Sequence, residues 1–346
     1  MRRILLLVFL LLFLGVPSSA AEITAPEVPP EAEARMPEET SSFGEGLRQL
    51  LQKAITGLRP DLREAARVSL SSMAAVMMVS ILQSFSGPVK KITDLAGAAA
   101  VASVLLLSSD TLIRLGADTV RQLSEYGKLL LPVMTAGMAS QGGVTASTAL
   151  YTGTAVFDTI LGSLIANFLV PMTYLFLALA AGSSALGEDI LKKMRDFVKW
   201  LMSWSLKTLL TVYTTYMSIT GVVSGTTDAV ALKAAKMTIS SVVPVVGGIL
   251  SDASESVLVS AGLMKNAAGI YGILAILAVF LEPFLRIGTH YLILKLTAAL
   301  CGVFGSKQMT ELIGDFSSAM GLLLAMTGAT CLLLLISTVC FMKGVG

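Results

Sequence analysis

A series of long apolar stretches after residue 67 constrains the fold of this chain more than any other feature. The 279 residues of this region carry 31 of the chain's 48 acidic and basic side chains, whereas residues 22–67 alone carry 15. The mean hydropathy of the whole chain, +0.79, is far above that of an ordinary soluble domain. Apolar runs of this length cross a bilayer as helices, so we predict an all-α integral membrane protein, a polytopic helical bundle with about six to eight spans.

The N-terminal residues have the order of a secretory signal peptide. Arg2 and Arg3 precede a short apolar run, and small residues suited to cleavage follow at Ala20 and Ala21. We therefore predict a signal peptide over residues 1–21, with an uncleaved first anchor as the alternative.

Residues 22–60 are predicted to form a polar unit ahead of the membrane part. Pro, Glu, Ala and Ser dominate up to residue 44, a composition typical of a disordered tether. Apolar residues then recur at helical spacing from Leu47 to Leu58, which predicts a short amphipathic helix that ends before Pro60.

Residues 61–128 are predicted to form a helical hairpin followed by a surface helix. Two spans, at 68–85 and 92–107, are separated by a doubly basic turn, and lysines in a short loop favour the cytoplasmic side. Charges that alternate in sign every three or four residues then predict a helix at the membrane surface over residues 111–128.

Two proline-punctuated blocks, 112 residues apart, predict an internal duplication. At this offset Pro132 falls on Pro244, and Pro171 falls on Pro283. Each block then reaches a charged amphipathic stretch that holds an Asp-Phe pair. Duplicated units with helix breaks in matching places are typical of membrane channels and transporters. The Asp-Phe pairs are Asp196-Phe197 and Asp315-Phe316.

The two repeats, residues 129–235 and 236–346, each begin with a segment that is expected to break inside the membrane. Proline removes a backbone donor and adjacent glycines permit positive φ, so a helix should end there. Broken or re-entrant backbone is tolerated in a membrane only where it is buried in protein or lines water, which makes these segments candidates for a pore or a partner-binding region. A plain corner at the surface is the alternative. The residues concerned are Pro132, Gly142, Gly143, Pro244, Gly247, Gly248, Ser251 and Asp252.

The sequence offers little for catalysis. His290 is the only histidine, so a histidine-based triad or a multi-histidine metal site has little to work with. P-loop, GxSxG and HExxH motifs are missing from the sequence, and no basic patch has interleaved aromatic residues. We therefore expect no enzyme activity, no cofactor or metal, and no nucleic-acid partner.

Four ionisable residues are predicted at membrane depth, where charges are costly and often functional. Glu282, Arg286 and His290 follow one another at i+4 positions beside Pro283. They form either a polar stripe that lines a pore or ion path, or an intrahelical Glu–Arg pair near the headgroups. Asp158 stands alone in an apolar stretch, either as a functional carboxylate or as a buried, hydrogen-bonded one.

A string in the second repeat resembles a known family. It runs from Lys236 through Pro244-Val-Val-Gly-Gly-x-x-Ser-Asp-Ala253 and continues with Asn266-Ala-Ala-Gly-Ile-Tyr-Gly272 and Glu282-Pro283. Together with the signal peptide and the polar tether, this string resembles the stage III sporulation protein AE family of endospore-forming Firmicutes. The resemblance covers roughly residues 45–346.

The resemblance implies a polytopic protein of the mother-cell membrane that surrounds the engulfed forespore. Its function is then that of a membrane subunit, with permease-like character, in the channel or secretion-like complex required for endospore formation. The expected partners are the other stage III A-operon membrane proteins, the forespore stage II Q protein reached through the complex, and the lipid bilayer. The family has no established catalytic residues to carry over. A stand-alone secondary transporter and a non-conducting membrane scaffold are the alternatives.

Overall fold

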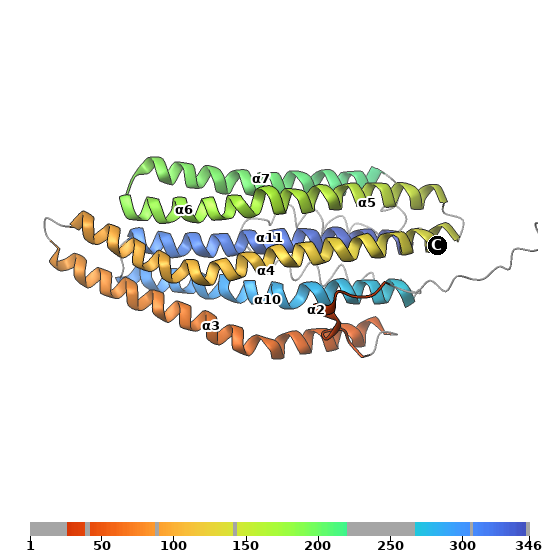
Figure 1. Ribbon diagram of the computed structural model, residues 1–346, viewed down its shortest axis with the longest axis horizontal. Coiled ribbons are helices and arrows are strands. Elements are labelled where there is room, and N and C mark those ends of the chain that lie inside the picture. The colour runs from red at the N-terminus through yellow and green to blue at the C-terminus, as the bar shows by residue number, and fades with distance from the viewer. Residues whose placement is uncertain are drawn as a thin grey trace, which may run out of the picture.

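The computed structural model describes residues 26–38, 42–86, 90–140, 144–219, 267–304 and 307–343. Within these ranges the regular elements are all helices, and they run side by side along an elongated bundle (Figure 1). The all-α fold is thus confirmed. The elements are α2 (Pro30–Glu33), α3 (Phe43–Phe85), α4 (Lys90–Ser140), α5 (Val144–Leu164), the π-helix η2 (Ile165–Leu169), α6 (Val170–Leu186), α7 (Asp189–Ile219), α10 (Ala267–Phe304) and α11 (Lys307–Lys343).

Five helical stretches of the described residues are long and apolar enough to cross a membrane. With 43 and 51 residues, α3 and α4 are about 65 and 75 Å long, roughly twice the thickness of a bilayer core. Each long helix therefore has room for a spanning part and an aqueous part. The segment that is expected to break near Pro244 lies outside the described residues. The five stretches are Phe43–Phe85, Lys91–Ala139, Ser147–Leu186, Gly269–Phe304 and Lys307–Met342.

The α10–α11 hairpin forms the centre of the bundle. In Figure 1 these two helices lie between α3 on one side and α5, α6 and α7 on the other. The most apolar window is 78% buried in α10 and 83% buried in α11, against 22–33% in the three other candidate spans. A helix that is apolar on all sides belongs inside a bundle, whereas the outer helices keep apolar side chains on their outer faces.

Three hairpins, α3–α4, α6–α7 and α10–α11, turn at the same end of the bundle, and α3–α4 reaches beyond the other two (Figure 1). Near its turn, the α3–α4 hairpin is packed closely at Gly97. A Cβ on this glycine would lie 2.4 Å from Val79 Cγ1, so only glycine fits without a shift of Val79. Small residues allow such close helix contacts in membranes.

Two of the expected helix ends do not occur. α3 runs through Pro60, so the predicted short helix at 47–58 and the predicted span at 68–85 belong to one helix. α4 likewise runs through Pro132, and it unites the predicted second span, the predicted surface helix and the predicted broken segment. Proline removes only one helical hydrogen bond here, and Leu130, Leu131 and Met134 around it are buried. Tertiary packing therefore outweighs the local signal, and the expected break at Pro132 is wrong.

Pro171 and Pro283, which match each other in the predicted repeat, both lie in described helices. Pro171 follows the π-turn η2, and the helix continues from α5 through η2 into α6. A π-turn changes the local hydrogen-bond register, which is a common way to accommodate a residue without an amide hydrogen. Pro283 lies inside α10, which is also continuous.

Several sequence predictions fall on residues outside the described ranges. These are the signal peptide and most of the candidate break residues, namely Gly142, Gly143, Pro244, Gly247, Gly248, Ser251 and Asp252.

Candidate functional site

The polar residues of α10 lie where this helix packs against α3. Arg286 Nε is 3.1 Å from Asp61 Oδ1, an ion pair without a well-aligned hydrogen bond, and Arg286 Nη2 is 3.3 Å from Glu64 Oε2. Asp61 is buried, with 8% of its surface exposed. The two acids are three residues apart on α3, so they present adjacent carboxylates to one guanidinium. Arg286 therefore connects α10 to the N-terminal half of α3 through ion pairs.

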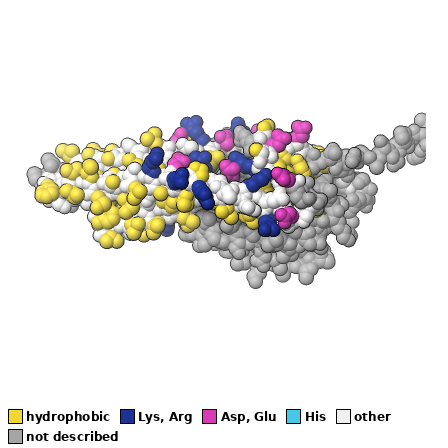
Figure 2. All heavy atoms as spheres, turned by 90° about the horizontal axis from the view of Figure 1, so that it is seen from below, with side chains coloured by type: hydrophobic (Ala, Val, Ile, Leu, Met, Phe, Trp, Pro, Cys, Tyr) yellow, Lys and Arg dark blue, Asp and Glu magenta, His cyan; other side chains and the backbone are white. Residues whose placement is uncertain are grey.

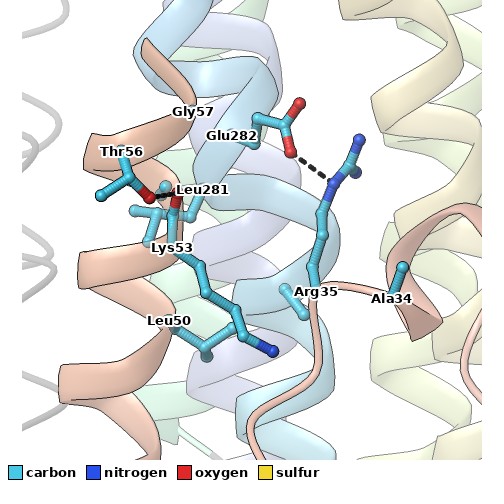
Figure 3. A pocket seen from close by; sticks show the side chains of 10 residues that line it. Ala34, Arg35, Leu50, Lys53, Thr56, Gly57, Leu281 and Glu282 are labelled. Atoms are coloured by element: carbon cyan, nitrogen blue, oxygen red, sulfur yellow. Dashed lines mark hydrogen bonds and ion pairs between the residues drawn. The ribbon is translucent and has the colours of Figure 1, made fainter. Parts of the chain in front are cut away.

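Glu282 has a different partner from the one predicted. Its Oε2 forms an ion pair with Arg35 Nε, in the segment that follows α2 (Figure 3). The intrahelical Glu282–Arg286 pair is therefore not formed, because each of the two residues pairs with another segment. The polar residues of α10 thus connect this helix to α3 and to the segment after α2. We call the following residues the α3–α10 cluster: Arg35, Asp61, Glu64, Glu282, Arg286 and His290.

His290 closes the buried end of this cluster. It is 1% exposed, and its Nδ1 lies 3.1 Å from the backbone oxygen of Arg286. A carbonyl oxygen can only accept a hydrogen bond, so Nδ1 donates the hydrogen of this bond. Among the described residues Nε2 has no hydrogen-bond partner. The ring is thus held by its own helix, one turn after Arg286.

A cavity of about 420 Å³ lies beside the cluster, between α3, α10 and the segment that follows α2 (Figure 3). Arg35 and Glu282 stand on one side of it. Lys53, on the other side, donates a hydrogen bond of 2.8 Å to the backbone oxygen of Met36. The cavity volume is within the range of small-molecule sites. The residues that line it are Ala34, Arg35, Leu50, Lys53, Ala54, Thr56, Gly57, Ala278, Leu281 and Glu282.

Asp158 lies apart from this cluster, on α5. It is 2% exposed and accepts a hydrogen bond of 3.2 Å from Ser124 Oγ of α4. Within the part of the chain that the structure describes, no Lys or Arg lies within ion-pair distance of it. One turn earlier on α5, Thr154 is fully buried and its hydroxyl has no described partner. Asp158 is therefore a buried carboxylate that contacts a neutral hydroxyl.

A third charged group joins α7 to α11, and it brings together the two Asp-Phe pairs of the predicted repeat. Arg195 lies 2.6 Å from Asp315 and 2.9 Å from Asp196, with only 12% of its side chain exposed. Lys199 donates a hydrogen bond of 3.0 Å to Ser318, and burial lowers the pKa of its ammonium group. The matching pairs therefore lie at one level of the bundle, where a single guanidinium contacts both carboxylates.

The residues that sequence reasoning missed are Arg35, Asp61 and Glu64. The i, i+3 spacing of the two acids is a usable signal, but Pro60 predicts a helix end that separates them from the preceding helix. Arg286, the partner of the two acids, and Glu282, the partner of Arg35, are both more than 200 residues away in the sequence. Local spacing cannot reveal such a pairing.

The described residues contain no candidate metal centre. They hold no group of three or more His, Cys, Asp or Glu side chains placed to bind a metal ion. Glu282 and Arg286 of α10 and Asp315 of α11 connect their helices to other parts of the chain. Pro132 lies in a continuous helix, so among the described residues the predicted break segments contribute no site.

The chain belongs to the stage III sporulation protein AE family, whose family model matches residues 33–344. This confirms the resemblance inferred from the sequence. Stage III sporulation protein AE of Bacillus subtilis (strain 168) is 22% identical to the chain over 207 residues, which are 60% of this chain and 52% of the relative. The chain thus spans about half the length of the curated relative it matches. No solved structure matches the chain.

Proposed function

We propose that this member of the stage III sporulation protein AE family is a non-enzymatic membrane subunit of the channel or secretion-like complex that joins mother cell and forespore. The observation that carries the proposal is the set of five apolar helices, of which three keep most of their apolar windows unburied, in a chain of a sporulation family. Such helices need a lipid or protein surrounding. We place the protein in the mother-cell membrane that surrounds the forespore.

The proposed partners are the other stage III A-operon membrane proteins and, through them, the forespore stage II Q protein. Family membership supports this choice. Among the described helices, the α10–α11 hairpin is the part around which a permease-like core would be built, because all the larger helices of the bundle surround it. Pro132 does not support a conducting segment, because α4 is continuous there.

Co-purification from sporulating cells tests the proposed assembly. The chain carries an affinity tag at its own locus, and membranes are solubilised from cells collected after engulfment. We expect the stage III A-operon proteins to elute with the tagged chain and to be absent from an untagged control. Elution of the chain without them would contradict the proposal.

Deletion of the gene in its host tests the sporulation role. We expect development to stop after engulfment and heat-resistant spores to be lost, with both restored by a copy of the gene at another locus. Normal numbers of heat-resistant spores in the deletion strain would overturn the proposed function.

A non-conducting scaffold is the second candidate, and the pairing of the α10 charges favours it. Glu282 and Arg286 bind α3 and the segment after α2, so in this structure they join helices and do not line a path. Ion flux through liposomes separates the candidates. Flux by the purified chain alone would indicate a transporter, flux that needs the other complex members a channel subunit, and absence of flux in every combination a scaffold.

A further inference from the structure

Three arginines form a row along the outer face of α3. Arg59, Arg63 and Arg67 are spaced four residues apart, so they lie one above the other on the helix, and all three are exposed. Across the described residues, none of the three has an ion pair or a hydrogen bond. The row is therefore a strip of positive charge without a partner on this surface.

Other exposed arginines of the outer helices are neutralised. Arg48 pairs with Glu45, Arg114 with Asp110, and Arg121 with Asp118, each within 4 Å. The acids closest to the row in sequence, Asp61 and Glu64, are engaged by Arg286 of α10. Among the described residues, the row thus differs from the other exposed arginines in having no acidic partner.

The row ends where the apolar surface of α3 begins. Residues 68–85 contain no charged side chain, and Leu70, Met78 and Phe85 among them are 66%, 65% and 84% exposed. These 18 residues extend about 27 Å, close to the thickness of a bilayer core. Figure 2, which looks onto the α3 side, shows apolar side chains over this end of the bundle and, where the apolar surface stops, Lys and Arg side chains with Asp and Glu among them.

The neighbouring helix α10 has a cation at the same level. α3 and α10 run in the same direction, since Asp61 pairs with Arg286 and, further along both helices, Ser69 contacts Thr297. Lys295 precedes Thr297 by two residues, as Arg67 precedes Ser69. Lys295 is exposed and has no ion pair with a described residue, and exposed apolar side chains of α10 follow it.

We propose that Arg59, Arg63, Arg67 and Lys295 bind the phosphate headgroups of anionic phospholipids at the membrane surface. The inference rests on the membrane location given under Proposed function. Guanidinium groups bind phosphate oxygens in a bidentate manner, and basic residues next to a spanning segment attract anionic lipids. The continuity of the row with the apolar surface identifies a lipid as the occupant, because one phospholipid contacts both regions at once.

Bound lipid measured on the purified full chain tests this proposal. The protein is held in mixed micelles that contain phosphatidylcholine and phosphatidylglycerol in equal amounts, re-isolated, and extracted to quantify both lipids. The test variant carries R59Q, R63Q and R67Q together. The matched control carries R48Q, R114Q and R121Q, which removes the same net charge from exposed but paired arginines.

We expect the unchanged chain and the control to retain more phosphatidylglycerol than phosphatidylcholine. The row variant should lose this preference: the affinity for phosphatidylglycerol relative to phosphatidylcholine should fall about fivefold for each arginine removed. Adding K295Q should lower the preference further. Raising the salt concentration should weaken the preference of the unchanged chain, because screening acts on exposed charges.

Two outcomes would overturn the proposal: a row variant that keeps the preference of the unchanged chain, or a control that loses as much as the row variant. Circular dichroism melting checks that each variant folds. If the triple variant does not fold, the proposal is tested with R63Q alone and with the salt series on the unchanged chain. A preference for phosphatidylglycerol that neither R63Q nor salt reduces would refute the proposal. Should the chain leave the membrane in alkaline carbonate, the proposed membrane function fails; a chain that stays there without lipid preference refutes this inference alone.

Discussion

The α3–α10 cluster and the surroundings of Asp158 both hold a buried carboxylate in an apolar helix bundle, but they treat it differently. Asp61 faces the guanidinium of Arg286 from another helix, whereas Asp158 accepts a hydrogen bond from a serine hydroxyl. The first arrangement balances a charge with a charge. The second provides a neutral hydroxyl in contact and only the more distant charge of Lys128, so the two sites should respond in opposite ways when the charge is removed.

Desolvation explains why this difference matters. A buried ion pair contributes little beyond the cost of removing both groups from water, but loss of one partner leaves the other charge uncompensated. A lone buried carboxylate carries that cost already. The α3–α10 cluster therefore has a structural explanation as a connection between helices. Asp158 connects α5 to α4 through a hydrogen bond alone, and its charge has no ion-pair partner among the described residues.

The largest effect is expected from Arg286→Ala. The substitution leaves Asp61 buried without its cation and releases α3 from α10, so the free energy of unfolding should fall by about 3 kcal/mol. Thermal unfolding of the purified full chain in detergent, followed by circular dichroism, measures the change. Arg114→Ala is the control, since Arg114 pairs with Asp110 on an exposed face and its loss should leave the melting temperature nearly unchanged.

A double substitution separates charge from packing at the same place. Asp61→Leu with Arg286→Met removes both charges and keeps apolar volume, so the protein should recover at least half of the stability lost in Arg286→Ala. The same melting experiment gives the comparison. A double variant as unstable as Arg286→Ala would show that the ion pair itself, and not the unpaired acid, accounts for the loss.

The sequence predicts the helices and some residues of the α3–α10 cluster, but not the contacts between them. The spacing of Glu282, Arg286 and His290 placed them on one helix face, and long apolar runs indicated the helices themselves, because both signals are local. The partners of Arg286 cannot be predicted in this way, because Pro60 indicates the end of a helix and long-range contacts leave no trace in local spacing. Pro132 shows the same limit, because buried neighbours hold α4 together across it.

Asp158→Asn should have a smaller effect of the opposite sign. Asparagine keeps an oxygen to accept the hydrogen bond from Ser124 and removes the charge, so stability should stay the same or rise by up to about 1 kcal/mol. Melting of the purified variant tests this, and spore formation by the same variant tests function. A clear loss of stability would mean that Asp158 has a compensating partner and that the two sites are alike.

Glu282→Gln is expected to have the smallest effect and to define the limits of the α3–α10 cluster. The Glu282 side chain is 41% exposed and that of its partner Arg35 is 30% exposed, so solvent screens the pair and its loss should cost no more than about 1 kcal/mol. Because the Arg286 side chain pairs with Asp61 and Glu64 and forms no ion pair with Glu282, the effects of Glu282→Gln and Arg286→Ala should be additive in the double variant. A cost well above the sum of the two would show that Arg35, Glu282 and Arg286 act as one unit. The contrast with Asp158 would then involve the whole junction of α3, α10 and the segment after α2, and not Asp61 alone.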